Sequence, residues 1–77
     1  MRLVSQDGTF DFPYELAVVY KSDCEIHVRL IHSFGFHDVI GKYSSQEKVE
    51  EVLGDLRNAY RNQKSAFYFP EDEEVEI

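Results

Sequence analysis

The chain has 77 residues, of which 43% are hydrophobic and 14% aromatic, and its formal net charge is -7. This length suits one small domain, and the apolar content is sufficient for a core that needs neither a metal nor a disulfide. A single cysteine excludes an internal disulfide, and the few, scattered Lys and Arg residues make direct binding to nucleic acid unfavourable.

The first residues predict a β-hairpin. Asp7-Gly8 separates two short β-prone runs, and glycine adopts the positive φ of a tight turn without strain. Phe10 and Phe12 share one face of the second run, so we expect that face to point to the core. Pro13 lacks the N–H that a sheet requires and ends the strand.

Three further strands are expected before the helix. Residues 16–21 (LAVVYK) form a continuous apolar run, which predicts a central strand buried on both faces. Residues 24–32 (CEIHVRLIH) alternate between apolar and polar side chains, which predicts a half-buried antiparallel strand. Residues 33–36 indicate a turn, and residues 38–43 (DVIGKY) predict the next strand.

Residues 44–63 carry the clearest helical pattern in the chain. Ser44 and Glu47 have the spacing of a capping box, and acidic residues precede basic ones, as the helix dipole favours. Gly54 lies inside the pattern, and we expect it to permit close approach to the sheet. One apolar stripe at helical spacing is formed by Val49, Val52, Leu53, Leu56 and Tyr60. We therefore predict an amphipathic helix over residues 45–62.

The end of the chain predicts a short strand followed by an acidic tail. Residues 65–69 (SAFYF) are β-prone, and Pro70 ends them. Five of the fifteen acidic residues lie in residues 71–77, which leaves the remainder at -7 + 5 = -2. We expect a mobile tail over 71–77 and one domain over 1–70. The tight turns and single helix predict an α+β fold, a small antiparallel sheet with the helix packed on one face.

The composition also predicts where the protein resides. A lone thiol suits a reducing cytoplasm, and the first residues lack the apolar segment of a secretion signal. No apolar run approaches the length that spans a bilayer. We therefore expect a cytoplasmic protein with no membrane partner.

Four potential zinc ligands occur within fourteen residues: Cys24, His27, His32 and His37. Thiolate and imidazole are the usual ligands of structural zinc, and four of them complete a tetrahedral site. The spacing C-x2-H-x4-H-x4-H is not one of the established zinc frameworks, and a strand would place His27 and His32 on opposite faces. The alternative interpretation is that these are polar residues on a strand face and in the following turn.

An enzymatic role is not supported by any motif. The glycines are scattered and form no phosphate-binding loop, and no nucleophile motif surrounds Cys24. A domain of this size also offers little room for a cleft. We therefore predict a protein that is not an enzyme.

Both ends of the chain carry motifs that resemble those of a known family. Residues 4–15 read VSQDGTFDFPYE, residues 42–60 read KYSSQEKVEEVLGDLRNAY, and the chain closes with FYFPEDEEVEI. These segments resemble a family of small uncharacterised proteins from Gram-positive bacteria and their phages. That family shares the opening V-S-Q-D-G-T-x-D-x-P-Y-E, the helix start Y-S-S-x-E-K and an acidic end. The resemblance implies a product of a mobile element, located in the cytoplasm of a bacterial host cell.

Small acidic phage proteins of one domain are often inhibitors of host machinery, and by class analogy this chain is similar to anti-CRISPR proteins. We therefore expect an inhibitor that binds a host protein, with a CRISPR nuclease as the first candidate. Its acidic side chains would mimic DNA against a basic, nucleic-acid-binding surface. The residues expected to bind this partner are Glu47, Glu50, Glu51 and Asp55 on the helix, and Glu71, Asp72, Glu73 and Glu74 in the tail.

Two alternatives remain open from the sequence. One is a small zinc-stabilised domain centred on the cysteine and the three histidines. The other is a homo-oligomeric accessory phage protein, in which residues 33–36 or the strand at 65–69 would pair with a second copy.

Overall fold

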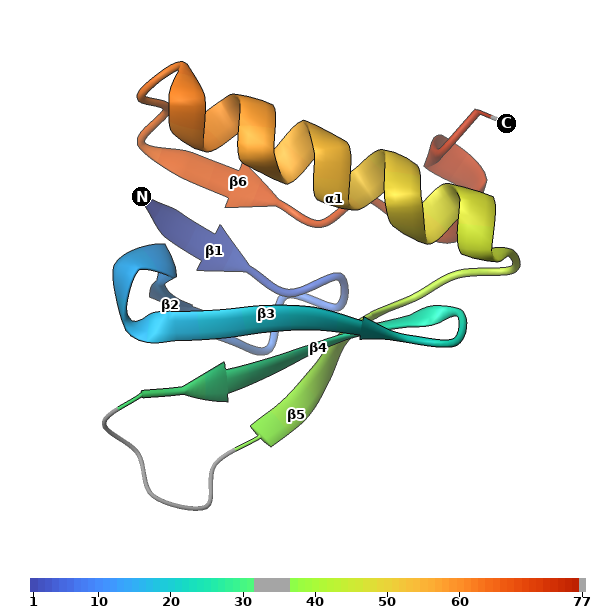
Figure 1. The fold of residues 1–77 in the computed structure, drawn as a ribbon, viewed down its shortest axis with the longest axis horizontal. Helices are drawn as coiled ribbons and strands as arrows, with labels where there is room; N and C mark the ends of the chain where they lie inside the picture. Colours follow the sequence, from blue (N-terminus) through green and yellow to red (C-terminus); the bar gives the residue numbers. More distant parts are fainter. Residues whose placement is uncertain (32–36, 77) are drawn as a thin grey trace.

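The computed structural model describes residues 1–31 and 37–76. Figure 1 shows one long helix lying across a set of short strands. The elements are β1 (Arg2–Val4), β2 (Asp11–Pro13), the 3-10 turn η1 (Tyr14–Leu16), β3 (Ala17–Ser22), β4 (Glu25–Leu30), β5 (His37–Lys42), α1 (Gln46–Arg61), β6 (Ala66–Tyr68) and the 3-10 turn η2 (Asp72–Glu74).

The strands form two three-stranded sheets, ordered β2-β1-β6 and β3-β4-β5. The α+β class with one packed helix is therefore confirmed, but the strands do not form the single sheet that we expected. All strand pairs are antiparallel except β1 and β6, which run parallel with Leu3 opposite Phe67. This pair can be parallel because the helix carries the chain back across the domain before β6 begins.

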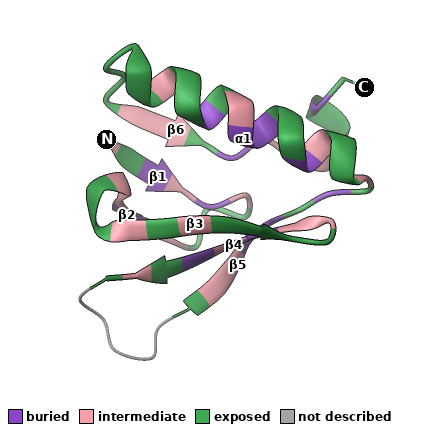
Figure 2. Cartoon of the chain, in the orientation of Figure 1, coloured by how far each residue is buried: buried purple, intermediate pink, exposed green. Residues whose placement is uncertain are grey.

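One core joins both sheets to the helix. Its fully buried side chains come from β1, β4, β5 and α1, and they are Leu3, Ile26, Val28, Ile40, Val49 and Val52. Figure 2 shows buried residues on α1 and on the strands that it covers, with exposed residues on the outer side of α1. Phe12 is buried as the hairpin pattern predicted, and Phe10 packs against this core while half-buried.

The prediction that residues 16–21 form a central strand is wrong. β3 lies at the edge of its sheet, where it pairs only with β4. Its apolar residues alternate between the two faces, so Val19 points toward the core while Val18 and Tyr20 are exposed. A continuous apolar run is consistent with a strand that has one covered face and one uncovered face, because periodicity alone does not show what covers the second face.

The helix begins one residue later than the predicted capping box implies. Ser45, not Ser44, is the N-cap, and its Oγ accepts a hydrogen bond from the N–H of Lys48 at 3.2 Å. Serine is a favoured N-cap residue at either position. The backbone N–H of Ser44 donates instead to Asp72 Oδ1. The expected close approach at Gly54 is also wrong, because a Cβ atom there would meet nothing within 4 Å.

Within the described residues, no helix is both long enough and apolar enough to cross a lipid bilayer.

Candidate functional site

Residues 71–76 of the acidic tail fold back onto the domain, whereas we expected a tail without fixed contacts. Glu71 and Glu74 form a reciprocal capping box around η2, in which the Glu71 N–H donates to Glu74 Oε1 at 2.8 Å. Val75 follows η2 and buries its side chain in the common core, with only 8% exposed. An apolar residue among carboxylates thus holds the tail in place.

Two side chains from other segments bind the backbone just before the tail. The Tyr43 hydroxyl donates to the Pro70 carbonyl oxygen at 2.8 Å, and Gln6 Nε2 donates to the same oxygen at 3.1 Å. Burial raises the pKa of Tyr43 well above its ordinary value, and the nearby carboxylates of the tail raise this pKa further. The hydroxyl therefore stays protonated and remains a hydrogen-bond donor at physiological pH.

Asp72 joins the tail to the start of α1. Its Oδ1 accepts the Ser44 N–H at 2.8 Å and lies 3.4 Å from Lys48 Nζ, which also donates to the Asp72 carbonyl oxygen at 2.8 Å. The hydrogen bond from the Ser44 amide lowers the pKa of Asp72, and the Lys48 charge lowers it further. Asp72 is therefore a structural contact between the tail and the helix.

Carboxylates of the helix and the tail meet on one surface as a result. Glu51 and Asp55 of α1 line a shallow depression of about 370 Å³ together with Glu74 and Glu76 of the tail. Glu47 precedes Glu51 by one helical turn on the same side of α1. We call Glu47, Glu51, Asp55, Glu74 and Glu76 the acidic surface. Among the described residues, none of these five side chains is in an ion pair.

The other residues expected to bind a partner lie in different surroundings. Glu50 points to the opposite flank of α1, where it forms an ion pair with Lys21 of β3. Asp72 is engaged with Lys48, and Glu73 is exposed in η2. Glu76 was not among the predicted residues, because the tail was expected to be mobile and the burial of Val75, which sets its path, was not foreseen.

The described zinc-ligand candidates are distributed along the second sheet. Cys24 lies in the turn between β3 and β4, and His37 lies opposite Arg29 at the start of β5. His27 Nε2 is 3.0 Å from Glu25 Oε1, and the His27 ring stacks on Tyr20 with centroids 5.4 Å apart. His32 lies outside the described residues. Within residues 1–31 and 37–76, no three potential ligands gather as a metal site would require, and the zinc site stays a prediction.

The acidic surface is suited to binding cationic groups. Its carboxylates are exposed and form no ion pair with a cation in residues 1–31 or 37–76, so Lys or Arg side chains of a partner would meet no competing cation from that part of the chain. The depression is shallow and is formed by side chains at the rim of the domain, which suits a broad protein contact better than a small ligand. Comparison of the chain with protein-family models, with curated proteins and with solved structures finds no match.

Proposed function

We propose that this protein is a non-enzymatic binding domain whose acidic surface occupies a basic, nucleic-acid-binding surface of a host protein and thereby inhibits it. The observation that carries the proposal is the anchoring of the tail. Val75 and Asp72 hold residues 71–76 against α1, so carboxylates from two separate segments contribute to one surface.

The spacing of the helical carboxylates supports mimicry of a nucleic-acid strand. Glu47, Glu51 and Asp55 recur every four residues, which places them about 6 Å apart along the helix axis. The phosphates of one DNA strand also form a regular row of negative charge, so this row of carboxylates resembles such a strand in sign and regularity. A preformed row of this kind offers charge at fixed positions without the entropic cost of ordering a flexible tail.

The partner that this surface fits is a protein with a positively charged channel for nucleic acid. CRISPR nucleases have such channels, and they remain the first partner class to test. Complementary charge of this kind accelerates association, and binding weakens as salt screens the carboxylates.

The test measures binding to a guide-loaded CRISPR nuclease from a Gram-positive host by biolayer interferometry at low and high salt. One variant neutralises the helical part of the acidic surface: Glu47→Gln, Glu51→Gln and Asp55→Asn. A control variant removes the same charge elsewhere: Asp11→Asn, Asp23→Asn and Glu25→Gln. Salt-sensitive binding that the first variant loses and the control retains is the expected result.

Equal binding by the wild type and the first variant would overturn the electrostatic proposal for this partner. A tagged pull-down from nuclease-treated lysate extends the test to other basic host proteins, with the same two variants as the criterion. A partner captured equally by both variants would not be held through the acidic surface.

A further inference from the structure

The longest open strand edge in the described structure belongs to β3. The Ile31 N–H donates to the Leu16 carbonyl oxygen at 2.8 Å, and backbone groups of an antiparallel strand alternate in direction. The N–H and C=O groups of Val19 and Lys21 therefore point away from β4, as does the C=O of Ala17, whereas the Ala17 N–H donates to the Tyr14 carbonyl oxygen. The outer edge of β5 is partly covered, because the Gln6 N–H donates to the Ile40 carbonyl oxygen at 2.8 Å. The remaining edge strands, β2 and β6, have only three residues each.

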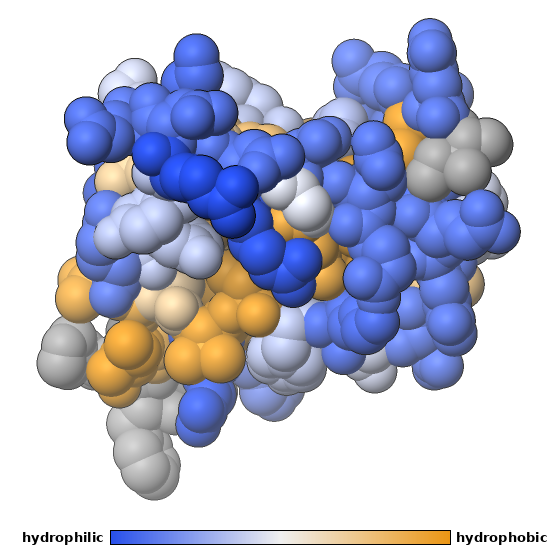
Figure 3. Space-filling model, turned by 45° about the horizontal axis from the view of Figure 1, so that its top comes forward, coloured by the Kyte–Doolittle hydropathy of each residue, from blue (hydrophilic) through white to orange (hydrophobic). Residues whose placement is uncertain are grey.

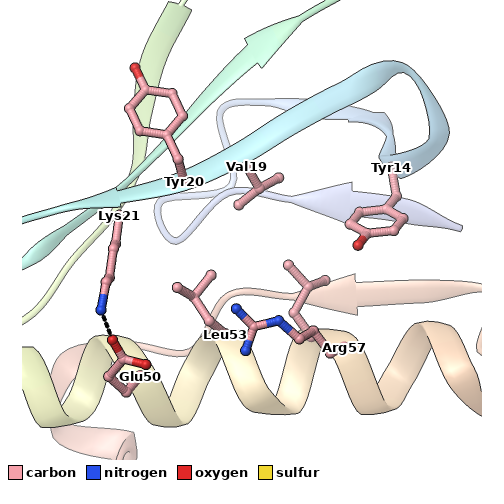
Figure 4. Close-up of a pocket in the computed structure, with 8 residues that line it drawn as sticks. Tyr14, Val19, Tyr20, Lys21, Glu50, Leu53 and Arg57 are labelled. Atoms are coloured by element: carbon pink, nitrogen blue, oxygen red, sulfur yellow. Dashed lines mark hydrogen bonds and ion pairs between the residues drawn. The ribbon is translucent and has the colours of Figure 1, made fainter.

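Exposed apolar side chains concentrate beside this edge. Four of the six large exposed hydrophobic side chains among the described residues lie on β3 or next to it: Leu16 (42% exposed), Val18 (39%), Tyr20 (41%) and Ile31 (58%). Figure 3 shows hydrophobic surface gathered at the lower left of the view, while most of the remaining face is hydrophilic. In Figure 4, Tyr20 points away from α1, and Lys21 points toward it.

A groove of about 190 Å³ runs between β3 and α1 on the other side of the strand (Figure 4). Val19 and Leu53 line its apolar part, and Glu50 and Arg57 lie on either side of Leu53 along the helix. Glu50 pairs with Lys21, whereas Arg57 is exposed and in no ion pair with a described residue. An open edge beside such a groove is the arrangement to which an additional strand can be added.

We propose that the added strand is β3 of a second copy of this chain, paired antiparallel about a two-fold axis at Val19. In that register Val18 of each copy lies opposite Tyr20 of the other, which is a favourable pairing of a β-branched and an aromatic residue. Lys21 lies opposite Ala17 of the second copy, so no like charges meet across the strands. Every exposed apolar residue of β3 then gains an apolar partner.

The charged side chains of α1 are also complementary across this two-fold axis. The two helices run antiparallel in this arrangement, with Leu53 near the axis. Glu50 and Arg57 lie three and four residues from Leu53, so Glu50 of one copy comes to the same level as Arg57 of the other. This symmetric pattern favours a second copy over an unrelated strand, because the chain supplies both signs of charge to its own partner. The acidic surface lies on the opposite flank of α1 and stays accessible in both copies.

The test compares two double variants at the same two positions. Their effects on the dimer differ only if these positions face each other as the proposed register places them. The double variant Val18→Glu, Tyr20→Lys places Glu opposite Lys twice across the axis, whereas Val18→Lys, Tyr20→Lys places Lys opposite Lys twice. Both positions are exposed, and both variants lose the same ring contact with His27. Sedimentation velocity over a range of protein concentrations measures self-association, and circular dichroism checks the fold.

The expected result is a wild-type dimer that the Glu/Lys variant retains. The Lys/Lys variant should have a dimer dissociation constant at least about tenfold higher, because both cross-strand pairs become repulsive. Equal association by the two variants would overturn the register. A wild-type chain that stays monomeric at the highest concentration would overturn the dimer and leave this edge to a strand of another protein. Hydrogen exchange gives a second readout, since the amides of Val19 and Lys21 should gain protection as concentration rises.

Discussion

Replacement of Val75 by Ala tests whether the tail is anchored by its own core contact. The change removes two buried methyl groups from a side chain that is only 8% exposed. At about 0.8 kcal/mol per buried carbon, we expect the free energy of unfolding to fall by about 1.5 kcal/mol. For a domain of this size each kcal/mol corresponds to a decrease of about 4–8 °C in the midpoint of thermal unfolding.

The assay is urea denaturation followed by circular dichroism, with Glu76→Ala as the matched control. Glu76 is the next residue along the chain and is exposed, so its replacement should change the stability little. If undocking of the tail is a local event, the loss for Val75→Ala is limited to the docking free energy of residues 71–76. Identical stability of Val75→Ala and the wild type would show that the tail contributes no packing, and the preformed acidic surface would then be refuted.

Three further substitutions follow from the helix and its contact with the tail. Gly54→Ala should raise the free energy of unfolding by up to about 1 kcal/mol, since the new Cβ meets nothing within 4 Å; an unchanged or lower urea midpoint would contradict this. Ser45→Ala should cost about 1 kcal/mol through loss of the helix cap, whereas Ser44→Ala, whose contact is made by its backbone, should be nearly neutral by the same measurement. Asp72 has a lowered pKa in the folded state, so its stabilisation is present above the ordinary pKa of aspartate and is lost as pH falls through the folded value. Below about pH 4, wild-type stability should therefore decrease more steeply than that of Asp72→Asn, and parallel pH profiles would exclude this role.

The sequence pattern was sufficient for the local elements. Helical spacing located α1 to within one residue at each end, and alternation over residues 24–32 located β4 to within one residue at its start and two at its end. The division into two sheets was not predictable, because the pairing of β1 with β6 depends on contacts between residues more than sixty positions apart. No local propensity encodes which strand becomes an edge, and so β3 was expected at the centre.

Four of the five residues of the acidic surface, all except Glu76, could be found from charge alone. The carboxylates on α1 are visible as a periodic row, but whether the tail joins them depends on Val75, a single apolar residue in an acidic segment. The isolated position of Val75 among glutamates is the signal that indicates a folded tail. Glu50 was expected in the acidic surface but lies outside it, because it faces Lys21. Helical spacing alone did not distinguish the flank of α1 that faces Lys21 from the flank that faces the tail.

The parallel pairing of β1 with β6 has a consequence for synthesis on the ribosome. Leu3 is fully buried, yet its neighbour across the sheet is Phe67, near the other end of the described chain. β1 must therefore wait until more than sixty further residues have been synthesised before this edge is covered. Nascent chains that stop before residue 66 would leave β1 unpaired on that side, so the domain should acquire protease resistance late and in a single step.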